Sequence, residues 1–214
     1  MTDIDIGSIV PSTRDLLQVV STRRKSLALV ARIDALEPAS EAARLYELNI
    51  SAFAFAEPDQ RLTQSATATK TVPSLSLTPA QNRQDCLRAR YFGADGLPVD
   101  AHLPLEEWDP VAKTARTMRM LPLAFASDKA SLENAIKAGA RAVLLKAASA
   151  EEWLTLLAEL PAQAQRGLIV VADLGDAADA QALKQLFQKA DAAIVPPSVH
   201  QAPGFAALVN ELDP

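Results

Sequence analysis

The chain of 214 residues has little of the chemistry on which many functional sites depend. It has one cysteine, Cys86, and two histidines, His102 and His200. A single cysteine excludes an internal disulfide and a cluster of metal-binding thiolates, and the two histidines lie in separate segments without the spacing of metal ligands. Cys86 has no histidine or basic residue beside it, so we expect a packed small residue. We therefore expect no metal and no cofactor.

The sequence also lacks a basic surface pattern and a long apolar run. The net charge is −5, and the lysines and arginines are scattered apart from a short run at residues 23–25, which argues against nucleic-acid binding. No apolar run reaches the roughly 20 residues of a membrane span. The first residues carry acids where a secretory signal has a basic region and an apolar core. We expect a cytoplasmic protein that binds neither nucleic acid nor membrane.

Eight short apolar runs alternate with longer segments of helical period. Parallel strands that are buried on both faces read as such runs, so the alternation is typical of α/β architecture. The expected strands are Leu27–Ile33, Ala52–Ala56, Ser74–Leu77, Gly96–Val99, Leu121–Phe125, Ala142–Leu145, Gly167–Ala172 and Ala192–Val195.

The helical segments between these runs often begin with Ser, Asp or Pro, which suit the first turn of a helix. Residues Gln60–Thr71 are polar and threonine-rich, and we expect a poor or absent second helix there. Residues Pro11–Val20 are expected to form a helix that closes the bottom of the fold. The other expected helices are Glu41–Leu48, Pro79–Tyr91, Pro110–Met118, Ser131–Ala138, Ala150–Leu160, Asp179–Lys189 and Gly204–Glu211.

Eight strand–helix units with short connections favour a closed (β/α)8 TIM barrel over an open doubly wound sheet. An open sheet would also be expected to have a glycine-rich turn after its first strand, whereas residues 34–38 read Asp-Ala-Leu-Glu-Pro. We predict a single compact barrel over residues 1–214, with an irregular second β/α unit and with residues 1–26 as an N-terminal extension or helix.

Three scaffold motifs stand in an order that resembles the indole-3-glycerol phosphate synthase family. They are Pro11-Ser12-Thr13-Arg14, then Val72-Pro73-Ser74-Leu75 followed by residues 88–96, and residues 132–141. The resemblance covers roughly residues 11–209. It implies a TIM barrel and, for the family itself, closure of an indole ring with loss of carbon dioxide and water in tryptophan biosynthesis.

The chain departs from this family at the carboxyl ends of the strands, where barrels carry their function. The family's proton-donating lysine after the third strand falls on Leu77, which supplies no proton. Its glutamate on the fifth strand falls on Phe125, and its phosphate-pocket glycine falls on the prolines at 196–197, which have no N–H for a phosphate. The resemblance therefore predicts a barrel without synthase activity that binds a small molecule or a protein partner.

The expected ligand-binding residues lie on the same rim. They are Arg32 and Asp34 after the first strand, Asp100 after the fourth, Gly175 after the seventh and Ser198 after the eighth. Any barrel has some polar rim, so a solvated loop face with ion pairs is the plainer interpretation.

Lys146 and Asp173 are the candidate catalytic residues of an alternative function. A lysine at the end of the sixth strand resembles the Schiff-base lysine of class I aldolases, and an apolar setting from residues 144–148 would favour the nucleophilic amine. Asp173 could shuttle protons to it. Lys146 could equally extend to solvent or bridge Asp173. A weak synthase in tryptophan biosynthesis is a third possibility.

Overall fold

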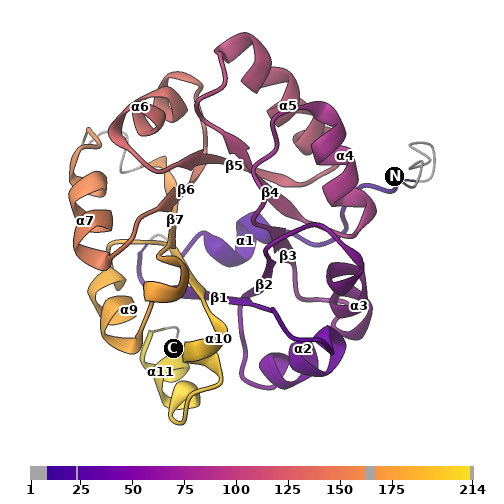
Figure 1. Cartoon of the computed structure of the whole chain (residues 1–214), viewed down its shortest axis with the longest axis vertical. Coiled ribbons are helices and arrows are strands. Elements are labelled where there is room, and N and C mark those ends of the chain that lie inside the picture. Colours follow the sequence, from indigo (N-terminus) through magenta and orange to yellow (C-terminus); the bar gives the residue numbers. More distant parts are fainter. Residues whose placement is uncertain (1–8, 23, 162–166, 213–214) are drawn as a thin grey trace.

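The chain forms a closed barrel of eight parallel strands in the order β1 to β8, so the predicted (β/α)8 fold is confirmed. A computed structural model describes residues 9–22, 24–161 and 167–212. Figure 1 shows the strands as an inner ring with the helices around them. Residues 1–8 and 23, which belong to the N-terminal extension expected at 1–26, lie outside the described residues.

Each of the eight expected strands forms close to its expected position. We call the end of the barrel where the strands finish the mouth, and the end where they begin the lower end. The strands are β1 (Ala28–Arg32), β2 (Ala52–Phe55), β3 (Ser74–Ser76), β4 (Gly96–Asp100), β5 (Leu121–Ala126), β6 (Ala142–Lys146), β7 (Ile169–Asp173) and β8 (Ala192–Val195).

Helices lie around the outside of the barrel, except for the first one, which enters its lower end. They are α1 (Leu16–Val20), α2 (Pro38–Tyr46), α3 (Gln60–Ala68), α4 (Arg83–Tyr91), α5 (Leu105–Thr117), α6 (Lys129–Lys137), α7 (Ala150–Ala158), α9 (Ala180–Leu186), α10 (Pro197–His200) and α11 (Phe205–Leu212), with a 3-10 turn η2 at Gly175–Ala177. Within the residues that the structure describes, none of these helices combines the length and apolar character needed to cross a membrane.

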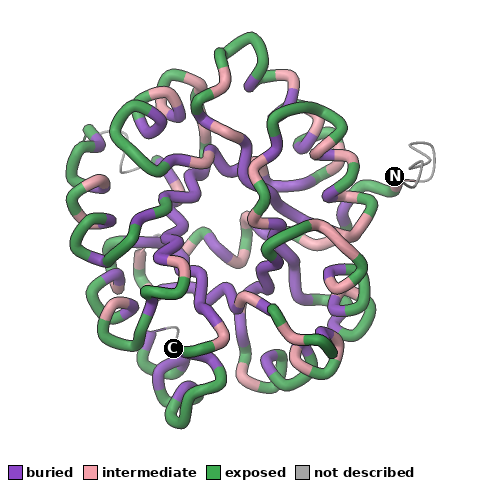
Figure 2. The backbone as a smooth tube through the Cα atoms, viewed as in Figure 1, coloured by how far each residue is buried: buried purple, intermediate pink, exposed green. Residues whose placement is uncertain are grey.

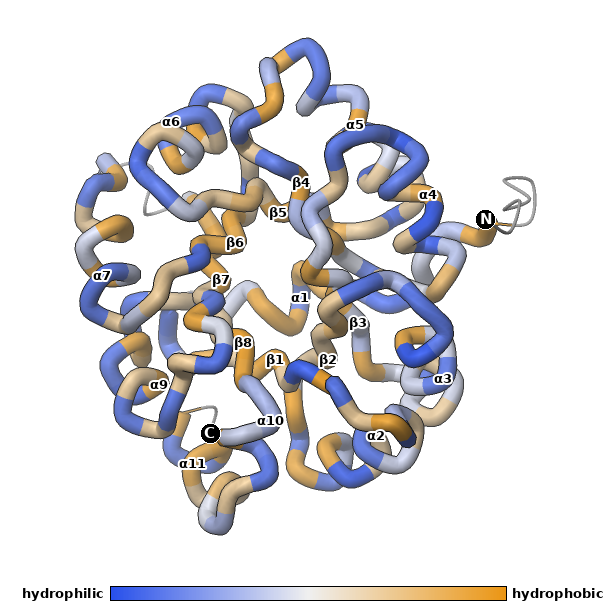
Figure 3. Tube along the Cα trace, in the orientation of Figure 1, coloured by the Kyte–Doolittle hydropathy of each residue, from blue (hydrophilic) through white to orange (hydrophobic). Residues whose placement is uncertain are grey.

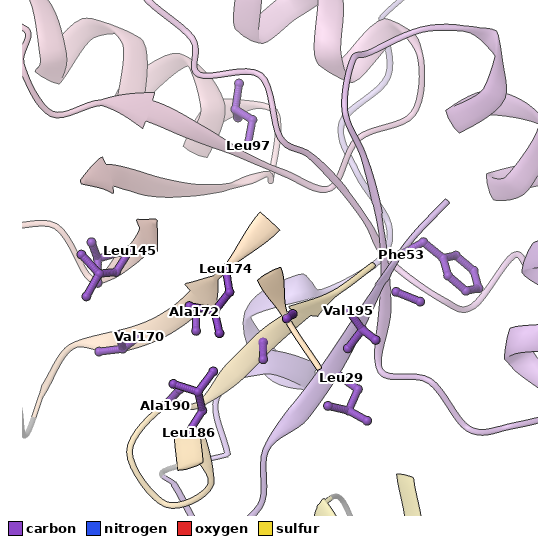
Figure 4. Packing of buried hydrophobic residues seen from close by; sticks show 14 of the residues in the cluster. Leu29, Phe53, Leu97, Leu145, Val170, Ala172, Leu174, Leu186, Ala190 and Val195 are labelled. Atoms are coloured by element: carbon purple, nitrogen blue, oxygen red, sulfur yellow. The ribbon is translucent and has the colours of Figure 1, made fainter. Parts of the chain in front are cut away.

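The strands are buried on both faces, and each face contributes to a separate cluster of buried side chains. Side chains such as Leu29, Phe53 and Leu145 point outward into the core beneath the helices (Figure 4). The inward face is lined largely by small or branched residues, including Ala28, Ala54 and others. Figure 2 shows the inner ring almost wholly buried and the outer helix faces exposed. Successive residues of a strand therefore alternate between the barrel interior and the outer core.

The short helix α1 fills the lower end of the barrel. The side chain of Asp15 caps it by accepting a hydrogen bond from the backbone N–H of Gln18. Leu16 and Val20 are buried against the inward-facing residues of the strands. A Cβ atom placed on Gly96 would lie 2.3 Å from Cδ2 of Leu16. Glycine at the start of β4 thus leaves the space that this leucine occupies.

Two buried aspartates hold the lower loops in place. Asp95 accepts a hydrogen bond from the N–H of Ser74, and Asp191 accepts one from the N–H of Val170, in each case from 21 residues earlier in the chain. The guanidinium of Arg14 lies 2.7 Å from the Asp95 carboxylate. Because a buried charge needs partners, these contacts fix the segment before α1 to the underside of the barrel.

The expectation of a poor or absent helix at Gln60–Thr71 is wrong, because α3 covers nine residues there. Threonine lowers the intrinsic helix propensity, but tertiary contacts outweigh it. Asp59 caps the helix, Leu62 is buried, and the Ser65 hydroxyl donates to the carbonyl of Pro38 at 3.1 Å. The hydroxyl of Thr67 returns a hydrogen bond to the carbonyl of Thr63.

Helix α5 also begins earlier than expected. The sequence places Pro110 at a helix start, but the helix begins at Leu105 and Pro110 lies inside it. The additional turn buries the side chain of Trp108, which is 4% exposed. Burial of an indole stabilises this turn enough to offset one missing N–H donor.

We predict that Gly96→Ala destabilises the fold by about 1–3 kcal/mol, because its new methyl group would collide with Leu16. Chemical denaturation measures this change. Gly167→Ala is the control, because a Cβ there meets no atom within 4 Å. Leu16→Ala alone should cost about 2–5 kcal/mol.

The double variant with both substitutions should lose less than the sum of the two losses, because the alanine at 96 would occupy space that Leu16 vacates. Simple additivity would show that α1 does not enter the barrel at this point.

Candidate functional site

The strand alternation brings four ionisable residues to the inward face at the mouth. Val30, Leu144 and Val171 line the barrel interior, so the residues two positions later point the same way. Figure 3 shows hydrophilic segments where several strands end above a hydrophobic ring. The residues at these inward positions are Arg32, Ala56, Leu77, Asp100, Phe125, Lys146, Asp173 and Pro196.

Lys146 and Asp173 end two neighbouring strands and are partners in the register of β6 and β7. Asp173 is 7% exposed, and its Oδ1 atom accepts a hydrogen bond of 2.9 Å from the N–H of Gly175. Lys146 is exposed, and no ion pair or hydrogen bond joins its ammonium group to another residue within 9–22, 24–161 or 167–212. The ammonium group is thus available beside a carboxylate.

The apolar enclosure expected around Lys146 is not formed. Leu145 and Ala147 are buried in the outer core, because the alternation of the strand turns them away from the mouth. The lysine at the tip of β6 therefore extends toward solvent. A solvated ammonium is a hydrogen-bond donor and a positive charge rather than a nucleophile.

Arg32 is held in a cluster of charges above β1. Its Nε atom donates to Asp34 at 2.9 Å, and its Nη2 atom donates to Asp176 in η2. Burial lowers the pKa of Arg32, but the hydrogen bonds to Asp176 and Asp34 outweigh this effect and raise it. The cluster connects the loop after β1 to the loop after β7 and gives two of the guanidinium nitrogens, Nε and Nη2, a hydrogen-bond acceptor.

Asp100 orients the exposed His102 at the mouth. Oδ1 of Asp100 lies 3.1 Å from Nδ1 of His102, and Oδ2 of Asp128 lies 3.3 Å from Nε2. Hydrogen bonds to Asp100 and then to Asp128 raise the pKa of His102. The sequence does not predict the contact of Asp128 with His102, because Asp128 is typical of an N-cap residue, as it is for α6.

His200 is buried, with 1% of its surface exposed. It lies at the end of α10, with its Nε2 atom 2.8 Å from the carbonyl oxygen of Arg32 and its Nδ1 atom 3.1 Å from Nη2 of Arg44. Burial lowers the pKa of His200. The carbonyl accepts from Nε2–H and Arg44 donates to Nδ1, so the neutral imidazole fits both contacts.

Gly175 and Ser198 lie on different loops of the mouth. Gly175 has a φ of +56° in η2, a conformation that favours glycine, and its N–H is already bound to Asp173. Ser198 is exposed on α10, beside the buried Pro196. Their proposed role in ligand binding stays a prediction, as does that of Arg32, Asp34 and Asp100.

The described parts of the chain contain neither a cluster of metal ligands nor a reactive thiol. No group of three or more His, Cys, Asp or Glu residues is arranged there to hold a metal ion. Burial raises the pKa of Cys86 to about 12, and its thiol contacts the carbonyl of Val111 at 3.5 Å. The expectation that Cys86 is a packed small residue is confirmed.

Comparison with known proteins finds similarity in structure but not in sequence. No family model matches the chain, and no curated protein matches it. Solved structures that are similar include a 3-hexulose-6-phosphate synthase, with 18% identity over 87% of this chain and 98% of the other and a TM-score of 0.66. The 3-hexulose-6-phosphate synthase from Salmonella typhimurium has 12% identity over 87% and 96% of the two chains and a TM-score of 0.69. KGPDC from Streptococcus mutans has 12% identity over 89% and 100% and a TM-score of 0.68.

These neighbours correct the resemblance drawn from the sequence. The resemblance to indole-3-glycerol phosphate synthase, and with it a place in tryptophan biosynthesis, is wrong, because the similar barrels described above are hexulose-phosphate synthases and KGPDC. The inference of a barrel without catalysis is wrong for the same reason, since it depended on that family. The motifs behind it, such as Val72-Pro73-Ser74-Leu75, form a strand and turn that carry scaffold rather than chemistry.

The two histidines should titrate on opposite sides of the ordinary value of 6.5, with His102 above it and His200 below it. Hydrogen-bonded carboxylates favour the charged ring of His102, and burial disfavours that of His200. NMR titration of the two ring C–H signals measures both midpoints, and His102→Asn assigns them. Two coincident midpoints near 6.5 would contradict the two environments.

Acid should weaken the fold partly through His200. A histidine with a lowered pKa in the folded chain binds its proton more readily when unfolded, so its contribution is present above 6.5 and is lost as the pH falls through the folded pKa. The free energy of unfolding should therefore fall more between about pH 8 and about pH 5 in the natural chain than in His200→Gln. Equal slopes in the two proteins would contradict this.

Proposed function

We propose that this chain is an enzyme whose active site is the mouth of the barrel, and that it acts on a small phosphorylated ketose at the carbon beside the carbonyl group. The observation that carries the proposal is the pair at the ends of β6 and β7: an ammonium group, Lys146, without an ion-pair partner among the described residues, next to the buried carboxylate of Asp173. Catalytic groups of such barrels lie at this end of the strands.

The pair suits chemistry that passes through an enolate. A base removes a proton from the carbon beside a carbonyl, the electron pair of that C–H bond moves into the new C=C bond, and the carbonyl oxygen becomes negative. Asp173 accepts the proton through Oδ2, because the Gly175 N–H binds Oδ1. Lys146 donates a hydrogen bond to the developing oxyanion. Return of the proton restores the ketose.

Apolar side chains complete the inward ring and strengthen these charges. Leu77 and Phe125 are partly buried and pack on the barrel interior, and Pro196 is buried. Lys146 is exposed in the free chain, so a bound substrate that contacts these apolar side chains would displace water from it, lower the local dielectric and strengthen the action of its charge on the oxyanion. Leu77, Phe125 and Pro196 lack the groups that indole synthesis would need, and in this proposal they form the walls of a different active site.

The ketose class is supported by the neighbours and by the charge of the mouth. Two neighbours are named as synthases of a hexulose phosphate, which is a phosphorylated ketose. Lys146 is assigned to the oxyanion, so Arg32, the other cation of the inward ring, is the group that can face a phosphate ester. A small-molecule partner is part of this proposal. A cytoplasmic location, the absence of nucleic-acid or membrane binding, and any protein partner stay predictions.

Exchange of hydrogen for deuterium tests the reaction class without knowledge of the full reaction. The protein is incubated in deuterium oxide with a panel of five- and six-carbon ketose phosphates, and loss of the signal of the C–H beside the carbonyl is followed by proton NMR. We expect at least one member to exchange. Lys146→Met and Asp173→Asn should each slow this exchange by roughly 10²–10⁴-fold, because each removes a group that acts in the transition state.

Lys113→Met is the matched control, because Lys113 is an exposed lysine on α5, outside the mouth, and its loss should leave the rate unchanged. Borohydride added during turnover should leave the mass of the chain unaltered, since the lysine acts without a covalent bond. An inert panel, or full exchange by Lys146→Met, would overturn the proposal.

A further inference from the structure

A cavity of about 200 Å³ lies at the lower end of the barrel, between α1, the end of α5 and the turn before β6. Figure 1 shows α1 within the opening of the barrel, with α5 and α6 on one side of it. The mouth lies at the opposite end of the strands. This lower cavity is therefore separate from the site proposed above.

The floor of the lower cavity is apolar. Leu16 from α1, Met120 and Leu121 at the start of β5 are buried residues that line it. The indole of Trp108 forms a further wall. Such a surface binds a flat or branched apolar group of a few carbon atoms by removing it from water.

Three arginines surround this apolar floor. Arg116, Arg119 and Arg141 line the cavity together with a single acid, Asp15. Arg116 makes a loose contact with Asp109 at 3.6 Å. Both residues make backbone hydrogen bonds, but no ion pair or hydrogen bond joins the guanidinium group of Arg119 or Arg141 to another residue of the described segments. Three guanidinium groups against one carboxylate favour an anion.

Arg119 stands at a backbone position that arginine rarely takes. Its φ is +54°, in the left-handed region that favours glycine. Gly139 has this conformation in the turn after α6, with Asn49 after α2 and Gln188 after α9. Arg24, in the turn after α1, is a second arginine with this conformation, so the conformation alone does not single out Arg119. Arg119 differs from Arg24 because it lines the lower cavity.

The indole N–H of Trp108 supplies an independent observation. Trp108 is 4% exposed, and its Nε1 atom is buried without a hydrogen-bond partner. The residue lines the lower cavity and also a second cavity beside His102 and Leu103. The other tryptophan, Trp153, is different, because its Nε1 donates to the carbonyl of Leu145 at 3.0 Å. A buried donor without an acceptor is costly, and Trp108 carries this cost in the wall of the lower cavity.

We propose that the lower cavity is a binding site for a small aromatic carboxylate. The ring lies on the apolar floor beside Trp108, and the carboxylate is bound by Arg119 and Arg141, with Arg116 at the edge. The volume of about 200 Å³ admits a single ring with a short acidic group. Planar, bidentate pairing with guanidinium groups favours a carboxylate on such a ring.

The two tryptophans make the test specific. Titration of the ¹⁵N-labelled chain with benzoate should shift the indole N–H signal of Trp108 and leave that of Trp153 in place, with Trp153→Phe to assign the two signals. Benzyl alcohol, which has the ring without the charge, should bind at least about tenfold more weakly. Inorganic phosphate should also bind more weakly than benzoate, because it lacks the ring.

The double variant Arg119→Gln, Arg141→Gln keeps long side chains but removes both charges, and should weaken benzoate binding by at least about tenfold. Arg83→Gln, on the exposed start of α4, is the matched control and should bind benzoate as the natural chain does. The unchanged Trp153 signal reports that each variant is folded. Benzyl alcohol binding equal to that of benzoate, full binding by the double variant, or no shift of Trp108 would each overturn the proposal.

Discussion

Burial of both faces of every strand is the constraint on which the rest of this structure depends. The barrel interior is filled by a mixture of small and large side chains, such as Ala28 and Leu144, while Phe53 and its outward neighbours face the helices. Even the start of β4 needs glycine, because Leu16 of α1 enters the lower end there. The same alternation decides which side chain of each strand faces the mouth, and so it places the candidate catalytic groups.

The mouth differs from a merely solvated rim in the way its charges are distributed. Arg32 is engaged by two carboxylates and His200 is buried beneath it, so this side of the barrel is internally satisfied. Lys146 makes no such contact within the described residues, and its neighbour Asp173 keeps one carboxylate oxygen for other partners. Charges that are paired within the protein stabilise the loops. A charge without a protein partner at the end of a parallel strand can instead contribute binding energy to a ligand.

The sequence predicts the barrel well because apolar runs, turns and helix caps are local signals that agree with each other. It misses α3, whose threonine-rich segment is helical through contacts with α2, and the first turn of α5, which Trp108 stabilises by burial. At the site, the ends of strands locate Lys146 and Asp173, but burial of His200 depends on a contact 168 residues away in the chain. The lower cavity escapes sequence reasoning because its arginines come from separate turns. The family resemblance fails because scaffold motifs record how strands pack, and barrels with different chemistry share them.

A crystal structure of the chain with a bound ketose phosphate tests the central claim most directly, namely that the pair on β6 and β7 faces a substrate. The account predicts the carbonyl oxygen of the ligand within hydrogen-bond distance of Nζ of Lys146, with a carbon beside that carbonyl next to the Asp173 carboxylate. A ligand bound away from the mouth, with Lys146 closed onto Asp173 in a simple ion pair, would contradict it.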